Sequence, residues 1–436
     1  MAASVSGRSR RDPIPWALFV SGLAVIISTA VPGIGSLRLG LALPSLLVFG
    51  LVIWGRRVPR GMFGPFDLMV LLVGLAMLVS SLWAENPEEA IRSSVWVAMS
   101  LSAFFAFRFL LAAVGLRVGA AILGWAGGIV LIAYLVSIGV SRIMDVPWPA
   151  TWWMVDRGST RFTGLAAGPG PLAVCLAIFL FSALVGWKAW SSAQIGMLVG
   201  SLVVILASRS RTGLLGVLFL GTLFLVSSVG GAYGQSIRRR LLGTVGCILL
   251  VGCGLGLAGF WGWLGSDVAT KLASFIDDSS RFRLWGFGLG IFMDNPMAGL
   301  GLGQVQQTFE AGDVIPGLGA ELGSKDLWLH NTYLEIGAGA GFIALLPVAW
   351  LVVLTLRNCW MATDPTAGYL LVGGIFTQFA FHSSLTTSLF ALSLALLAEF
   401  VQTTPLVSAK SAHERIHHGD DDRRSSVNAM KKDIVI

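Results

Sequence analysis

Long apolar runs separated by short polar segments extend from residue 14 to residue 404 of the chain. A helix that spans a membrane needs about 20 apolar residues, and these runs are close to that length. They are continuous, whereas the strands of a transmembrane β-barrel alternate apolar and polar residues. The pattern therefore predicts an all-α integral membrane protein with about twelve transmembrane helices. The predicted spans are 14–31, 39–54, 66–83, 91–109, 118–140, 168–187, 191–207, 212–230, 240–264, 331–356, 367–383 and 388–404.

These spans divide the chain into five parts, with both termini on the cytoplasmic side. The first apolar run resembles a signal peptide, but Pro32-Gly33-Ile34-Gly35 provides no small-x-small cleavage site, so we interpret the run as a transmembrane helix. The polar, charged tail is predicted to be disordered. The parts are the N-terminus at 1–13, helices one to nine at 14–264, a long outer loop at 265–330, helices ten to twelve at 331–404, and the tail at 405–436.

Composition and charge agree with a membrane protein. The chain is 55% hydrophobic and only 12% charged, whereas about a quarter of the residues in a soluble domain are charged. A net charge of +7 is also seen in nucleic-acid-binding proteins, but basic loops in membrane proteins more often set orientation. On the predicted topology, most of the 30 basic residues, Arg108 among them, belong to cytoplasmic segments. This bias supports the assigned orientation.

The chain carries no pattern typical of a metal or disulfide site. Its four cysteines lie within or at the ends of apolar segments without C-x-x-C spacing, which is typical of small core residues. No H-E-x-x-H or similar ligand spacing accompanies the histidines. We therefore predict neither a metal nor another cofactor.

Two arginines lie in a tight turn on the outer side, where basic residues are disfavoured. The turn is Ser208-Arg209-Ser210-Arg211-Thr212-Gly213, and the helix that follows presents its N-terminal N–H groups to the same region. Guanidinium groups bind phosphate oxygens bidentately, so Arg209 and Arg211 predict a phosphate site at the outer membrane boundary. The alternative is that they are snorkelling membrane anchors.

Further arginines lie in two other outer segments. Arg161 follows several tryptophans that fit an interfacial belt better than a sugar-stacking platform. Arg281 and Arg283 begin a predicted interfacial helix that ends at Asn295-Pro296. These three arginines could bind phosphate or be solvated charges. Residues 299–303 read Gly-Leu-Gly-Leu-Gly and predict a flexible turn, since no strand precedes them as in a nucleotide-binding fingerprint.

Two histidines are candidates for chemistry. His330 ends the long loop and immediately precedes the tenth span, at the outer mouth of the membrane. A neutral imidazole there could accept a proton from an acceptor hydroxyl, although a polar cap is the simpler alternative. His382, at the outer end of the eleventh span, is a second candidate, with polar packing between helices as its alternative.

Three motifs in order along residues 205–345 resemble those of the bacterial O-antigen ligase and O-antigen polymerase superfamily. An earlier family block is matched only in part, because Arg161 and Gly164 are present but Gly170-Pro171 stands where Pro-Asn is common. The motifs are Ser210-Arg211-Thr212-Gly213, then Arg281-x-x-x-Trp285 with Asn295-Pro296 and Gly299-x-Gly301-x-Gly303, then His330-Asn331-x-Tyr333-Leu334.

The resemblance implies a multi-spanning glycosyltransferase of the GT-C type in the bacterial inner membrane, with the long loop between helices nine and ten in the periplasm. It implies lipopolysaccharide biosynthesis, by transfer of a glycan from undecaprenyl diphosphate to a sugar hydroxyl of lipid A–core without a nucleotide sugar or metal. Membrane lipids, donor and acceptor are then the partners, and nucleic acid is not. The implied catalytic residues are His330, Arg211 and Arg281, and the implied substrate-binding residues are Arg161, Arg209, Arg283, Asn331, Tyr333 and His382.

Three alternatives to an O-antigen ligase remain open at this point. An O-antigen polymerase or a protein O-oligosaccharyltransferase would use the same donor chemistry, although the protein-modifying enzymes often carry longer C-terminal regions than this tail. A transporter would place charges near mid-membrane and show internal repeats. Here the polar residues gather on the outer face, which disfavours the transporter.

Overall fold

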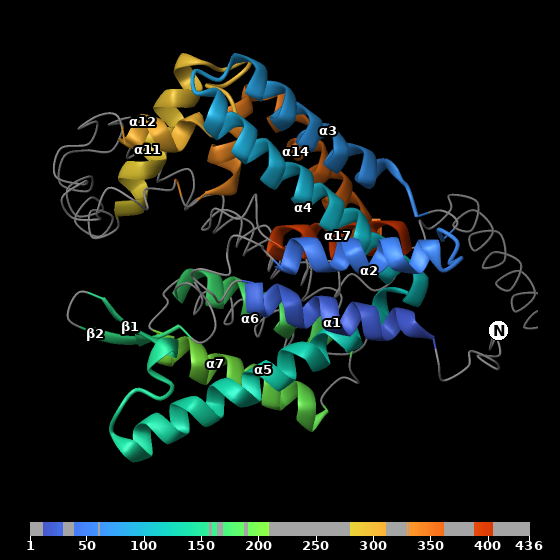
Figure 1. Ribbon diagram of the computed structural model, residues 1–436, viewed down its shortest axis with the longest axis vertical. Coiled ribbons are helices and arrows are strands. Elements are labelled where there is room, and N and C mark those ends of the chain that lie inside the picture. The colour runs from blue at the N-terminus through green and yellow to red at the C-terminus, as the bar shows by residue number, and fades with distance from the viewer. Residues whose placement is uncertain are drawn as a thin grey trace, which may run out of the picture.

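The computed structural model describes residues 12–28, 39–59, 62–156, 159–163, 169–186, 191–208, 280–310, 329, 331–361 and 388–403. Helices dominate this part of the chain, and one short β-hairpin interrupts them (Figure 1). The first elements are α1 (Pro13–Ser28), α2 (Leu39–Ile53), α3 (Pro65–Ser80), α4 (Pro87–Val114), α5 (Leu116–Met144), β1 (Trp153–Asp156) and β2 (Ser159–Phe162). They are followed by α6 (Pro169–Gly186), α7 (Ser192–Ser208), α11 (Ser280–Asp294), α12 (Gln304–Glu310), α14 (Thr332–Met361) and α17 (Ser388–Thr403).

The described helices have the length and composition expected of a membrane protein. Four are long and apolar enough to cross a membrane, namely Pro65–Trp83, Pro87–Val114, Leu116–Met144 and Thr332–Asn358. Shorter apolar helices, α1, α2, α6, α7 and α17, coincide with five further predicted spans. The predicted spans at 212–230, 240–264 and 367–383, residues 1–11 of the predicted N-terminus and the predicted tail at 405–436 lie outside the described residues. The helical membrane architecture is confirmed, while the count of twelve stays a prediction.

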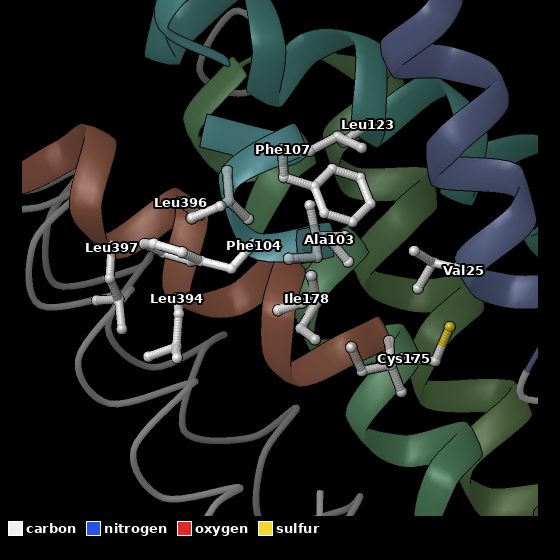
Figure 2. Packing of buried hydrophobic residues seen from close by; sticks show 14 of the residues in the cluster. Val25, Ala103, Phe104, Phe107, Leu123, Cys175, Ile178, Leu394, Leu396 and Leu397 are labelled. Carbon is white, nitrogen blue, oxygen red and sulfur yellow. The ribbon is translucent and has the colours of Figure 1, made fainter. Parts of the chain in front are cut away.

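α4 is the central helix of the bundle, and it packs against α1, α2, α3, α5 and α17. Asn86 begins it by accepting hydrogen bonds from the backbone N–H groups of Glu88 and Glu89. The carboxylates of Glu88 and Glu89 also interact favourably with the positive end of the helix dipole. Figure 2 shows side chains of α1, α4, α5, α6 and α17 converging on an apolar core that includes Phe104, Phe107 and Cys175. Cys175 is thus a core residue, as its apolar surroundings in the sequence indicated.

A buried ion cluster joins α3, α4 and α17. Arg108 of α4 is completely buried and donates to Asp67 of α3 at 2.8 Å and to Glu399 of α17 at 2.5 Å. It also donates to the carbonyl of Met62 at 2.8 Å and to the side chain of Gln402, which in turn donates to Asp67. The sequence analysis counted Arg108 only as a basic residue of a cytoplasmic segment, and it missed that this residue is buried and paired with two carboxylates. Distant carboxylates, invisible to a local pattern, allow this cation to be buried.

A β-hairpin lies in the segment that follows α5. β1 and β2 are antiparallel, with Trp153 paired to Phe162 and Met154 paired to Arg161. Phe162 is fully buried and makes edge-to-face contacts with Tyr134 of α5, Trp152 and Trp153. Trp152 and Trp153 therefore pack within the protein in addition to any role at the membrane interface. This hairpin was not predicted from the sequence.

α14 breaks at Gly341, whose φ of 65° and ψ of −158° are not helical. The break divides the helix into a first arm at 332–340 and a second arm at 342–361. A Cβ atom on Gly337 would lie 3.0 Å from the Leu345 side chain. Eight residues of straight helix would separate these positions by about 12 Å, so the chain folds back at Gly341. By length and composition Thr332–Asn358 is a candidate span, but its path is not one straight rod.

The loop between α11 and α12 fills the break in α14. A broken helix leaves backbone N–H and C=O groups without partners, and these groups are costly to leave unpaired in apolar surroundings. The loop supplies carbonyls to the second arm and N–H groups to the first arm. The bonds are Phe342 N to Pro296 O at 2.8 Å, Ile343 N to Met297 O at 3.4 Å, Leu300 N to Ala338 O at 2.8 Å and Gly301 N to Gly339 O at 2.9 Å.

The same loop is also fixed to the turn between α3 and α4. Gln304 exchanges two hydrogen bonds with the backbone of Asn86, one at 3.0 Å and one at 3.3 Å. A Cβ atom on Gly301 would lie 2.9 Å from the Ala84 backbone, and one on Gly299 would meet the Ala340 backbone. The glycines therefore permit close approach of backbones. The interpretation of residues 299–303 as a flexible turn was wrong, since both neighbours of the loop hold it in place.

The ion cluster generates a prediction about stability. Replacing Arg108 with Ala leaves Asp67 and Glu399 as buried charges without their cation, so we expect a loss of about 3–5 kcal/mol of unfolding free energy. Arg92→Ala is the matched control on the same helix, because the Arg92 side chain is 70% exposed beside Glu89 and should contribute at most about 0.5 kcal/mol. The unfolding free energies of both variants are measured by denaturation in mixed micelles. Equal losses would show that the cluster does not stabilise the bundle.

The break in α14 generates a second stability prediction. Gly341→Ala places a Cβ atom against the Met297 backbone at a left-handed φ, and we expect it to cost about 2–5 kcal/mol. Gly290→Ala, on the exposed side of α11 where a Cβ atom meets nothing within 4 Å, should be neutral or slightly stabilising. Unfolding free energies of the two variants make the comparison. If Gly341→Ala is as stable as Gly290→Ala, the interlocked loop is not the constraint described above.

Candidate functional site

The structure gives different amounts of detail for the predicted site residues. Asn331 and Tyr333 are described with their side chains. Arg161 lies in β2, and Arg281 and Arg283 lie in the first turn of α11, each described by its backbone. The remaining predicted residues, His330, Arg209, Arg211 and His382, lie outside the described residues.

α11, which carries two of these arginines, packs against the segment next to His330. Leu329 is 1% exposed and shares an apolar cluster with Leu284 and Ile291 of α11 and with Ala338 of α14. A Cβ atom on Gly288 would lie 2.7 Å from the Leu329 side chain, so Gly288 leaves the space that Leu329 occupies. The second and third sequence motifs are thereby brought together, although more than forty residues separate their first positions. Leu284 lies within one helical turn of Arg281 and Arg283.

Asn331 begins the first arm of α14. Its side-chain oxygen accepts hydrogen bonds from the backbone N–H groups of Tyr333 at 3.0 Å and Leu334 at 3.1 Å, the geometry of a helix N-cap. Asn331 is 9% exposed, and Leu329 on the other side of His330 is buried as well. His330 therefore stands in the chain between two fixed residues. The substrate-binding role predicted for Asn331 would fall to its amide NH₂ group, since its oxygen serves the helix.

Tyr333 lies at the wall of an apolar cavity between helices. The cavity is bounded by α3, α4, α17 and both arms of α14, and Thr332 and Ile336 line it beside Tyr333. The cavity is small, with a volume of about 50 Å³. The cavity thus extends to Thr332 and Tyr333, the two residues that follow Asn331 in the chain.

Residues without a predicted role also contribute to this region. Glu335 lies in the first turn of the first arm with one carboxyl oxygen buried, and an acidic residue just after an Asn cap is the signal that could have indicated it. Gln304 fixes the loop that fills the break in α14 by bonding to Asn86. No local sequence pattern predicts that Asn86 is its partner. Within the described ranges, no group of three His, Cys, Asp or Glu side chains is arranged to hold a metal.

Comparison with known proteins bears on the family resemblance. Residues 195–349 match a family model described as O-antigen ligase. The match confirms the resemblance to the O-antigen ligase and polymerase superfamily and supports a function of that type, a glycosyltransferase-like reaction with a lipid-linked sugar and a lipid acceptor. It covers the packed α11, the interlocked loop and the first arm of α14. None of the curated proteins matches the chain significantly.

The cap assigned to Asn331 can be separated from substrate binding by two variants. Asn331→Ala removes the capping oxygen and should destabilise the protein by about 1 kcal/mol, whereas Asn331→Asp keeps the cap and should not. Unfolding free energy and glycan transfer are measured for both. Transfer that is normal in Asn331→Asp and reduced in Asn331→Ala assigns the residue to the helix start. Transfer lost equally in both, with stability retained in Asn331→Asp, would contradict a purely capping role.

Proposed function

We propose that this protein is an O-antigen ligase of the bacterial inner membrane. It transfers a glycan from undecaprenyl diphosphate to a sugar hydroxyl of lipid A–core at the periplasmic face, within a GT-C-type arrangement of about twelve helices. One observation carries the proposal. The helix that bears Arg281 and Arg283 packs through Leu284 and Gly288 against Leu329, the residue before His330. The helix that carries these two arginines is thus packed against the residue that precedes His330 in the chain, which supports the proposal.

The arginines supply the charge that this reaction needs. As the bond between the anomeric carbon and the diphosphate breaks, negative charge grows on the leaving diphosphate. Arg281 and Arg211 stabilise this charge, and Arg161, Arg209 and Arg283 bind the phosphates. Guanidinium groups stay protonated at any physiological pH, so they can take the role that Mg²⁺ plays in other phosphate sites.

His330 supplies the base. The acceptor oxygen attacks the anomeric carbon from the side opposite the diphosphate, and the hydroxyl proton passes to the imidazole. The new glycosidic bond forms as the old bond to the diphosphate oxygen breaks, which inverts the anomeric configuration. Undecaprenyl diphosphate leaves, and the imidazolium returns its proton to water. Asn331, Tyr333 and His382 are assigned to substrate binding around this centre.

The genetic test uses a deletion strain whose lipopolysaccharide is separated on a gel and blotted for lipid-linked O-antigen. The proposal requires long glycan trapped on the carrier and bare core on lipid A. Core bearing one repeat would instead identify an O-antigen polymerase. An unchanged ladder would exclude both and direct attention to a protein-modifying ligase or a transporter.

The residue test uses purified variants. His330→Ala should lower the transfer rate at least about 100-fold because it removes the base, while donor binding changes little. Arg281→Ala should weaken both donor binding and transfer. Arg281→Lys keeps the positive charge but cannot bind phosphate oxygens bidentately. Arg92→Ala is the control for a remote exposed arginine. Equal loss of donor binding and transfer in His330→Ala would assign His330 a structural role.

A further inference from the structure

Glu335 projects from the side of the first arm of α14 that faces neither α11 nor the cavity. Ala338 belongs to the apolar cluster that the arm shares with α11. Tyr333, the other titratable side chain of this arm, lines the cavity together with Ile336. At 3.6 residues per turn, Glu335 lies on a third side of the helix, the side that also carries Asn331. The backbone N–H of Glu335 donates to the Asn331 carbonyl at 3.0 Å, so the two residues are one turn apart.

The place of Glu335 along the helix is the one that faces the residue before the cap. Asn331 is the N-cap, since its side-chain oxygen accepts from the backbone N–H groups of Tyr333 and Leu334. In the chain, His330 is therefore the residue before the cap and Glu335 the fourth residue after it. Side chains at these two positions of a capped helix often pack against each other and fix the angle at which the chain enters. Here the pair consists of an imidazole and a carboxylate, whose favourable contact is a hydrogen bond.

The proposed reaction calls for a negative charge beside its base. An imidazole that takes a proton becomes a cation, and Arg281 and Arg283 at the start of α11 are cations that oppose this change. Among the described side chains of α11 and of the first arm of α14, the carboxylates are Asp294 and Glu335. Asp294 ends α11, about 20 Å of helix away from the arginines. Glu335 is instead in the first turn after the segment 329–331.

We propose that Glu335 is a positioning residue that accepts a hydrogen bond from one ring nitrogen of His330. The other ring nitrogen stays free to take the proton of the acceptor hydroxyl, and the carboxylate remains ionised beside the imidazolium that forms. One carboxyl oxygen of Glu335 is buried, and burial reduces the screening of such a charge pair. The role of His330 as the base rests on the proposed function, whereas the pairing of the two side chains does not require transfer.

The rate test compares two variants at Glu335 with a control. Glu335→Gln keeps the shape of the side chain but removes its charge, so we expect transfer to slow at least about tenfold. The acid limb of the pH–rate profile should move about one pH unit lower, because an imidazole without its carboxylate holds a proton less tightly. Glu335→Asp keeps the charge and should keep the limb in place. Glu88→Gln, in the exposed first turn of α4 after the Asn86 cap, is the matched control and should change neither quantity.

A role confined to the start of the helix gives a different result. A carboxylate in the first turn also interacts favourably with the helix dipole, so Glu335→Gln would lower the unfolding free energy for that reason alone. Loss of the dipole interaction does not move the acid limb. An unchanged limb in Glu335→Gln would therefore overturn the proposal, whatever its effect on stability.

Chemical modification of His330 provides a readout that needs no transfer. Diethyl pyrocarbonate reacts with the neutral imidazole, and mass spectrometry of peptides follows the extent of reaction at His330 as the pH is varied. The midpoint at His330 should lie about one pH unit lower in Glu335→Gln than in the wild type. The midpoints of the other histidines should stay the same. Equal midpoints at His330 in the two proteins would contradict the pairing.

The two measurements separate this inference from the proposed function. A shifted midpoint in a protein that transfers no glycan refutes the proposed function and leaves the pairing of His330 with Glu335 standing. Transfer that depends on His330, with neither the limb nor the midpoint moved in Glu335→Gln, refutes the pairing and leaves the proposed function standing.

Discussion

Backbone hydrogen bonding at the break in α14 is the constraint on which this region of the protein depends. The chain cannot bury a broken helix in apolar surroundings unless the freed N–H and C=O groups find partners. Residues 296–301 provide those partners, and Gln304 fixes the same loop to the start of α4. The first arm of α14, with Asn331 at its beginning, is held from one side by this loop. Leu329 is held from another side by α11.

A second constraint acts through side chains on the helices around the cavity. Arg108, Asp67 and Glu399 join α3, α4 and α17, the three helices that face α14 across the cavity. A buried ion cluster of this kind does not by itself add much stability relative to an apolar core, but it is costly to break. It therefore fixes which helices are neighbours. The backbone interlock and the ion cluster together determine the walls of the cavity.

The sequence predicted those features that depend on local pattern. Apolar length located the described helices, the Ser-Arg start and Asn-Pro end bounded α11, and three ordered motifs indicated the superfamily that the family match supports. Features that depend on distant partners were missed. Gly341 lies in a glycine-rich apolar run, and nothing nearby shows that Phe342 and Ile343 after it donate to the carbonyls of Pro296 and Met297. The burial of Arg108 was missed because its partners Asp67 and Glu399 are remote in sequence. The roles of His330, Arg211 and Arg281 remain proposals.

The most direct test of this account is the position of the donor diphosphate, determined by electron cryomicroscopy of the protein bound to undecaprenyl diphosphate-linked glycan. The account predicts diphosphate density between the N-terminal turn of α11 and residues 329–333. Diphosphate bound away from both α11 and the start of α14 would contradict the claim that their packing builds the reaction centre.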